Sequence, residues 1–146
     1  MLKGINPIIS PELLKVLSEM GHGDQLVIAD GNFPAASHAQ RLIRMDGHNV
    51  PEVLDAILSL YPLDQYVEQQ VLLMEVCEGD TVVPAIWEAY KAILAKHEPG
   101  AQIGFLERFQ YYDEAKKAYV IIATSESAQY ANVVLKKGCI IKTHKS

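Results

Sequence analysis

The feature that most constrains the fold of this chain is the alternation of short apolar runs with segments of helical pattern. Six runs rich in Val, Leu, Ile, Met and Ala have the length of buried strands, at residues 26–29, 41–45, 70–76, 103–106, 119–124 and 132–135. Between them lie expected helices, at residues 11–20, 50–60, 83–96 and 108–117. The polar residues 31–40 are expected to form a loop. This alternation predicts an α/β layered fold with a largely parallel or mixed sheet.

The length of the chain suits a single domain, residues 1–146. A domain of this size buries about 70% of its unfolded surface, so it needs neither disulfides nor a metal to fold. Hydrophobic residues make up 49% of the sequence and charged residues only 21%, which leaves apolar surface for a partner subunit. Cys77 and Cys139 show no CxxC spacing, and we expect both to be reduced thiols in the core.

The charge of the chain argues against a nucleic-acid partner. The chain has thirteen Lys and Arg residues and eighteen Asp and Glu residues, so its net charge is −5. The first residues lack the pattern of a signal peptide, and no apolar run approaches the roughly 18 residues of a membrane span. The sequence therefore predicts a cytoplasmic protein that does not contact a membrane.

One stretch, residues 21–34, places two titratable side chains at the ends of a single apolar run. His22 precedes the expected strand 26–29, and Asp30 follows it directly. In α/β folds, ligands usually bind in the crevice beyond the carboxyl ends of strands. Asp30 has this position, and turn-forming residues come after it. Asp30 therefore marks a candidate ligand-binding site.

Several ordered blocks of the chain carry a resemblance to a known family. They are residues 9–14, 21–24, 30–34, 43–47, 108–112, 117–118 and 129–138. With these blocks the chain resembles the L-fucose mutarotase family, within the larger group that also holds D-ribose pyranase. The likeness runs nearly end to end. It implies a three-layer α/β/α fold with a central mixed, largely parallel sheet, and homo-oligomeric rings, typically pentamers stacked as decamers, in which a neighbouring subunit can complete each pocket.

The resemblance implies an isomerase that exchanges the α and β anomers of a reducing sugar without a cofactor. This reaction takes a proton from the anomeric hydroxyl and delivers one to the ring oxygen, after which the open aldehyde rotates and recloses. Because two groups must exchange protons near pH 7, a histidine is favoured as one of them. The sequence has no glycine-rich phosphate loop, no HExxH and no GxSxG, so nucleotide, zinc-protease and serine-hydrolase functions have no motif here.

The catalytic histidine of the family falls on His22, which the resemblance makes the acid/base residue. From the residues alone, a loop histidine after a helix is more often a capping or surface residue. Asp30 is expected to bind sugar hydroxyls and to tune His22, and its alternative role is a cap for the following turn. Asp24 is expected to orient the loop around His22 rather than to touch the substrate.

The resemblance places the other substrate-binding residues at Arg108, Tyr130, Ala131 and Asn132. As a fork of fixed donors, Arg108 can hold vicinal hydroxyls or pair with a carboxylate, although it could also be a solvated arginine at a helix start. The family commonly has glycine at the position of Ala131. If that glycine needs positive φ, the local backbone of this chain must differ.

Two aromatic residues and four further histidines complete the candidates. Phe33 and Tyr112 could cover the methyl group of a deoxy sugar, and core packing is an equal alternative. His38, His48, His97 and His144 show no metal-ligand spacing and are expected on the surface, so no metal site is predicted.

Three functions are left open at this point. The first is an L-fucose mutarotase. The second is a D-ribose pyranase, which arginine at position 108 disfavours because that branch tends to carry histidine there. The third is a sugar-binding accessory of an uptake system without catalysis.

Overall fold

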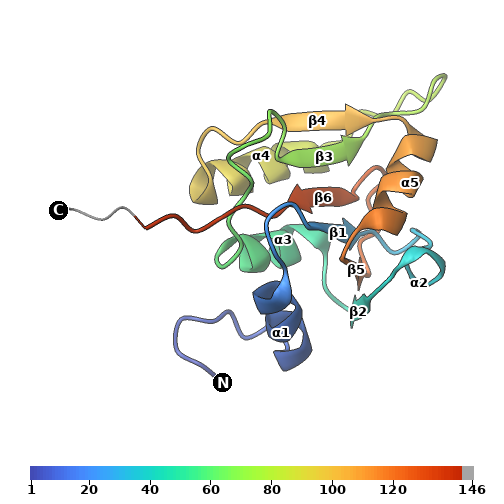
Figure 1. Ribbon diagram of the computed structural model, residues 1–146. Coiled ribbons are helices and arrows are strands. Elements are labelled where there is room, and N and C mark those ends of the chain that lie inside the picture. Colours follow the sequence, from blue (N-terminus) through green and yellow to red (C-terminus); the bar gives the residue numbers. More distant parts are fainter. Residues whose placement is uncertain (143–146) are drawn as a thin grey trace.

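The computed structural model describes residues 1–142 and contains one six-stranded sheet in the order β2-β5-β1-β6-β3-β4 (Figure 1). The strands are β1 (Gln25–Ala29), β2 (Leu42–Met45), β3 (Val71–Met74), β4 (Ile103–Leu106), β5 (Val120–Thr124) and β6 (Val133–Lys136). Strand pairs β1–β5, β2–β5 and β3–β4 are parallel, whereas β6 runs antiparallel to both of its neighbours. The sheet is therefore mixed and largely parallel, as predicted.

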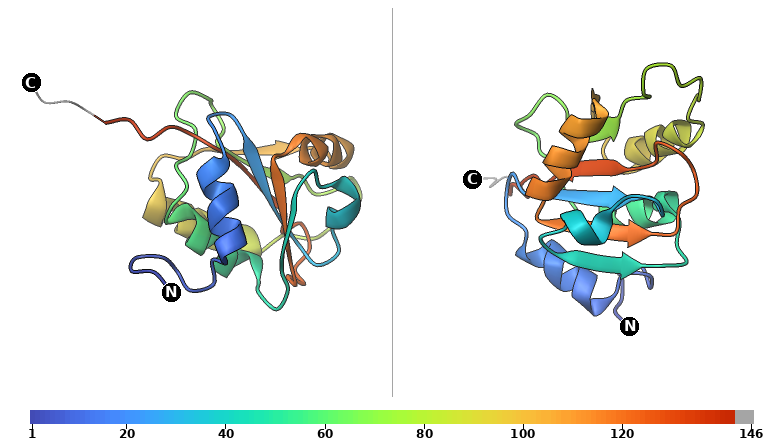
Figure 2. Two further views of the ribbon diagram at one scale, coloured as in Figure 1. Left: turned by 60° about the horizontal axis from the view of Figure 1, so that its bottom comes forward. Right: turned by 90° about the vertical axis from the view of Figure 1, so that its right-hand side faces the viewer.

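Helices cover both faces of this sheet (Figure 2). On one face lie α1 (Pro11–Glu19), α3 (Val50–Leu58) and α4 (Ile86–His97), and on the other lie α2 (Ala35–His38) and α5 (Arg108–Lys117). Each face has its own hydrophobic cluster. The α/β/α layering expected from the resemblance is confirmed.

Strand β1 shows why the strands read as unbroken apolar runs. Leu26 and Ile28 point into the cluster under α1, α3 and α4, while Val27 and Ala29 point into the cluster under α5. All four side chains are fully buried. A strand that is covered on both faces has no solvent side, so it needs apolar residues at every position.

Helix α1 begins at Pro11, as expected, and ends at Glu19, one residue before the expected end. The Ser10 hydroxyl accepts a hydrogen bond from the Leu13 N–H at 3.1 Å, and Pro11 occupies the first turn. At its other end, the C-cap residue Met20 is extended and buried, and Gly21 does not take the left-handed conformation that ends many helices. The positive φ lies instead at Gly23, in the turn that holds His22.

The loop expected at residues 31–40 and the core position expected for both cysteines were wrong, whereas both cysteines are free as expected. The expected loop 31–40 contains α2, whose four residues are too few to show helical periodicity. Both Cys77 and Cys139 are free but only partly buried, because each lies beyond the end of a strand rather than inside one. Within residues 1–142, no helix is long and apolar enough to cross a bilayer.

Candidate functional site

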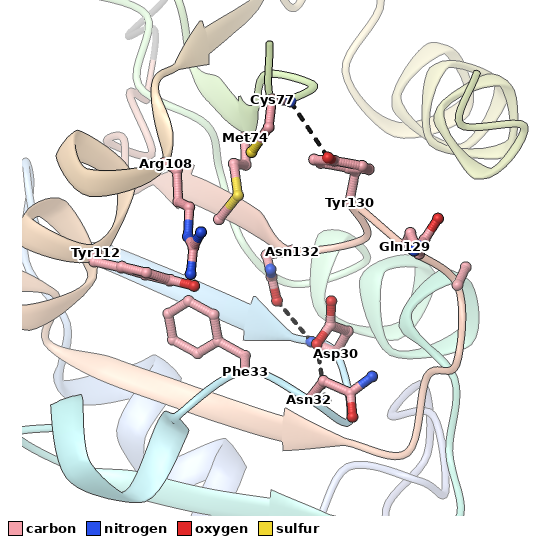
Figure 3. Close-up of a pocket in the computed structure, with 11 residues that line it drawn as sticks. Asp30, Asn32, Phe33, Met74, Cys77, Arg108, Tyr112, Gln129, Tyr130 and Asn132 are labelled. Carbon is pink, nitrogen blue, oxygen red and sulfur yellow. Dashed lines mark hydrogen bonds between the residues drawn. The ribbon is translucent and has the colours of Figure 1, made fainter. Parts of the chain in front are cut away.

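A cavity of about 270 Å³ lies at the edge of the sheet where the parallel strands end (Figure 3). Its lining includes Asp30 after β1, Cys77 after β3, Arg108 after β4, and Tyr130 and Asn132 just before β6. Because β6 is antiparallel, its first residues meet the carboxyl ends of its neighbours. The volume is slightly below the roughly 300–1,000 Å³ of small-molecule pockets, which suits a ligand as small as a monosaccharide.

Asp30 is held by the turn that it begins. Its N–H donates to the Asn132 side-chain oxygen at 2.8 Å, and its own Oδ1 accepts from the Asn32 N–H at 2.9 Å. Burial raises the pKa of Asp30, the N–H groups of Asn32 and Phe33 lower it in part, and the charge of Glu126 adds to the rise. Asp30 is thus a carboxyl group that takes up a proton more readily than an exposed one.

A glycine lets the chain turn closely after Asp30. The Gly31 N–H donates to the Glu126 carbonyl at 2.8 Å, and a Cβ on Gly31 would lie only 3.1 Å from that oxygen. A larger residue would push the β1 and β5 loops apart. This contact fixes the position of the loop that contains Asp30 against the loop that follows β5.

Tyr130 lines the cavity and has an unusual backbone conformation. Its φ is +56°, which is rare for a residue with a side chain, and the Trp87 Nε1–H holds its carbonyl at 2.8 Å. The phenol donates to Asp80 Oδ2 at 2.5 Å and accepts from the Cys77 N–H at 3.3 Å. The hydrogen bond to Asp80 raises the pKa of Tyr130 to about 12, so its hydroxyl stays neutral near pH 7.

Ala131 does not line the cavity. Its side chain is fully buried in the core, and its carbonyl accepts from the buried Tyr90 hydroxyl at 2.6 Å. Any contact between Ala131 and a ligand would therefore have to come from its backbone. The positive φ lies one residue earlier, at Tyr130, so alanine in place of glycine at position 131 meets no backbone strain.

Arg108 and two aromatic rings form the wall opposite Asp30 (Figure 3). Interaction with the Tyr112 hydroxyl raises the pKa of Arg108, and the guanidinium carbon lies 5.7 Å from the centre of the Tyr112 ring. Phe33 packs against Tyr112 with 5.6 Å between ring centres. Both rings therefore face the cavity while they also belong to the cluster under α5. His38 packs behind this wall, with ring centres 6.0 Å from Phe33 and 5.7 Å from Tyr112.

Five lining residues were not predicted as site residues from the sequence: Asn32, Met74, Cys77, Ala128 and Gln129. Met74 ends β3 and Cys77 follows it, at the same edge of the sheet as Asp30. The rule that ligands bind beyond the carboxyl ends of strands applies to Met74 and Cys77 as it does to Asp30. The apolar run 70–76, however, placed the end of β3 two residues too late.

His22 lies at the other end of β1. The strand between His22 and Asp30 has five residues and is about 16 Å long, so His22 does not line the cavity of its own chain. Asp30 cannot tune His22 across this distance, and that expectation was wrong within one chain. His22 Nε2 is instead 2.9 Å from Asp64 Oδ1, and its ring packs 5.5 Å from the centre of the Tyr66 ring.

Asp24 has the expected loop-orienting role. Its Oδ2 accepts a hydrogen bond from the Gly21 N–H at 2.8 Å, which closes the turn around His22. In the described part of the chain, no three His, Cys, Asp or Glu side chains gather closely enough to hold a metal ion. His144 lies outside the described residues.

The chain is similar to known proteins over nearly its whole length. The profile of the RbsD / FucU transport protein family matches residues 3–140. L-fucose mutarotase of Actinobacillus pleuropneumoniae serotype 5b (strain L20) is 48% identical over 139 residues, 94% of this chain and 96% of that protein. The crystal structure of fucose mutarotase from Streptococcus pneumoniae in complex with L-fucose is 50% identical, with a TM-score of 0.91 over 96% of this chain and 100% of that one. FucU from Bifidobacterium longum is 55% identical, with a TM-score of 0.92 over 95% and 100%.

Proposed function

Because the chain belongs to the RbsD / FucU transport protein family, we propose that it is an isomerase that interconverts the α and β anomers of L-fucose. One observation from the structure carries the proposal. A cavity of monosaccharide size combines a carboxyl, an amide and a phenol with a guanidinium and two aromatic rings on the opposite wall. Hydrogen-bonding groups suit the hydroxyls of a sugar. An apolar wall suits the part of a deoxy sugar that lacks a hydroxyl.

The polar groups of the cavity are the proposed sugar-binding residues. Asp30 and Arg108 approach the ligand from opposite walls, so one accepts hydrogen bonds from hydroxyls while the other donates to their oxygens. Tyr130 already donates its proton to Asp80, so its oxygen is available to accept a hydrogen bond from the sugar. The side-chain oxygen of Asn132 is used by Asp30, which leaves its NH₂ as a donor. Phe33 and Tyr112 cover the methyl group that distinguishes a 6-deoxy sugar.

The cavity needs an acid/base group, and no histidine lines it among the described residues. We propose that His22 of a neighbouring copy of the chain completes it, since His22 lies far from the cavity of its own chain. This role makes a ring-shaped homo-oligomer, such as the decamer expected from the resemblance, part of the proposal. His22 then exchanges a proton with the sugar while the ring opens, and the free aldehyde rotates about the C1–C2 bond and recloses. The cytoplasmic location stays a prediction.

Two other functions make different predictions. A D-ribose pyranase would act on a sugar without the methyl group, and the resemblance associates it with histidine rather than arginine at position 108. A sugar-binding accessory would bind L-fucose in the same cavity without changing the exchange rate. Measurements of the anomer exchange rate and the sugar affinity on the same samples distinguish both functions from a mutarotase.

The experiment is magnetisation exchange between the α and β anomeric protons, measured by NMR with and without the protein. L-fucose, D-ribose and D-galactose are compared at equal concentrations. Protein-dependent exchange that is fastest on L-fucose supports the mutarotase. Faster exchange on D-ribose favours the pyranase, and binding of L-fucose without exchange on any of the three sugars favours the accessory.

A further inference from the structure

We propose that Asp64 is a positioning residue for catalysis: it binds the Nε2–H of His22 and so leaves Nδ1 as the ring nitrogen that exchanges a proton with the sugar. This inference rests on the proposed function, in which His22 is the acid/base group. Neither Asp64 nor the choice of nitrogen could be read from the sequence, because His22 and Asp64 are 42 residues apart.

The hydrogen bond defines the tautomer of His22. Nε2 is 2.9 Å from Asp64 Oδ1, and the same oxygen accepts the Tyr66 N–H at 3.0 Å. An ionised carboxylate can only accept hydrogen bonds, so Nε2 must carry a proton. In the neutral ring, Nδ1 then holds the lone pair. The His22 side chain is 46% exposed while that of Asp64 is 5% exposed, so a sugar can approach the ring without contact with the carboxylate.

The environment of Asp64 keeps it ionised. Burial disfavours the charge, but the Tyr66 N–H, the His22 ring and the charge of Lys136 together outweigh it and hold the pKa of Asp64 below its usual value. Asp24 and Asp64 also act on the buried Tyr61: burial raises the pKa of that phenol first, and the two negative charges raise it further. Lys137 lies 5.9 Å from the centre of the Tyr61 ring.

Both halves of the pair are attached to the end of β6. The Asp64 N–H donates to the Lys136 carbonyl at 3.0 Å, and the Gly23 N–H, next to His22, donates to the Lys137 carbonyl at 2.9 Å. The Gly138 N–H donates to the Pro62 carbonyl at 2.8 Å, and a Cβ on Gly138 would overlap the Leu63 carbonyl oxygen. The two loops therefore have fixed positions relative to each other, as a positioning role requires.

The chain offers a matched control in a second histidine–aspartate pair. His97 Nε2 lies 2.6 Å from Asp55 Oδ1, between α4 and α3, and the His97 side chain is 16% exposed. The expectation that His97 is a surface residue was therefore wrong. Neither residue lines the cavity, and Lys96 shares the same carboxylate oxygen at 3.1 Å. This pair has the chemistry of His22–Asp64 without its proposed role.

The test compares Asp64→Asn with Asp55→Asn in the full-length protein. For Asp64→Asn we expect kcat on L-fucose to fall about 10- to 100-fold, a part of the 10²- to 10⁴-fold that a positioned acid/base group contributes, with KM changed less than about twofold. For Asp55→Asn we expect both constants to stay within about twofold. In parallel, the ¹⁵N shifts of labelled histidine report which nitrogen carries the proton, and wild-type His22 should be in the Nε2–H form in neutral solution.

The outcomes separate this inference from the function on which it rests. An active wild-type protein whose His22 is in the Nδ1–H form would overturn the inference without any variant, even if Asp64→Asn fails to fold. So would an Asp64→Asn protein with wild-type kcat, or an equal loss of kcat in Asp55→Asn. A wild-type protein without any exchange on L-fucose would instead overturn the proposed function, and the catalytic role of Asp64 with it.

Discussion

The two ends of β1 carry complementary halves of a chemical site. At the carboxyl end, Asp30 belongs to a cavity with groups that can bind a sugar but, among residues 1–142, with no histidine in its lining. At the amino end, His22 pairs with the buried carboxylate of Asp64 and is 46% exposed. In the proposed function, sugar binding and proton transfer therefore lie at opposite edges of one sheet. A single copy of the chain then holds both proposed parts of the site without bringing them together.

Removal of the His22 side chain should have the largest effect, and it should change the exchange rate rather than the affinity for the sugar. We expect His22→Ala to lower the anomer exchange rate of L-fucose by about 10²- to 10⁴-fold, because a positioned acid/base group contributes that much. The dissociation constant for L-fucose should stay within a few-fold, since the cavity is unchanged. NMR exchange and calorimetric titration measure the two quantities. A variant that loses affinity instead of rate would contradict the division between the two ends.

Replacement of Asp30 by Asn should affect the opposite half. Loss of a hydrogen bond to a charged acceptor predicts a fall in L-fucose affinity of about 10- to 100-fold. The stability should change in the other direction. Burial raises the pKa of Asp30 in the folded protein, so its ionisation costs stability as the pH rises from the unfolded value of about 3.9 through the folded one.

The stability of Asp30→Asn is measured by thermal unfolding at several pH values. Below about pH 3.9 the variant and the wild type should have the same Tm, because the protonated carboxyl resembles an amide. At neutral pH the variant should have the higher Tm. A wild type with the higher Tm at neutral pH would show that the carboxylate is stabilised in the folded protein, which would contradict the raised pKa of Asp30.

A change at Gly138 sharpens the comparison at the amino end. Gly138→Ala places a Cβ against the backbone oxygen of Leu63, so we expect a loss of about 1–3 kcal/mol in the free energy of unfolding. Gly104→Ala is the control, since its added Cβ meets the side chains of Gln69 and Leu72 rather than a backbone oxygen. Urea unfolding compares the two. Equal losses would mean that the close backbone contact at Gly138 has no special role.

The smallest effect is expected at His38, the histidine behind the aromatic wall. His38→Gln removes a ring that contacts Phe33 and Tyr112 but does not line the cavity. Exchange on L-fucose should stay within about twofold of the wild type, well below the range for an acid/base group. A loss as large as that expected for His22→Ala would transfer the acid/base role to His38 and place both functions at one end of β1.

The carboxyl-end half of the site was accessible from the sequence, while the amino-end half was accessible only in part. Asp30 directly follows a predicted strand, and the carboxyl ends of parallel strands meet at one edge, whereas Arg108 and Asn132 were predicted from the family resemblance. The partner of His22 was not predictable, because Asp64 is distant in sequence and has no local pattern. The contact between the Ala131 carbonyl and Tyr90 was not predictable for a related reason, because Tyr90 lies on a helix and is 41 residues away in sequence.

The measurement that tests the division of the site most directly is complementation between two inactive variants. His22→Ala keeps the cavity and Asp30→Ala keeps the histidine, and each alone should show little exchange on L-fucose. When equal amounts are coexpressed and the copies mix at random, about a quarter of the sites should combine an intact cavity with an intact His22 from a neighbour. Recovery of about a quarter of the wild-type exchange rate is the predicted result. Mixed oligomers, verified by mass spectrometry, that stay inactive would contradict a site shared between copies.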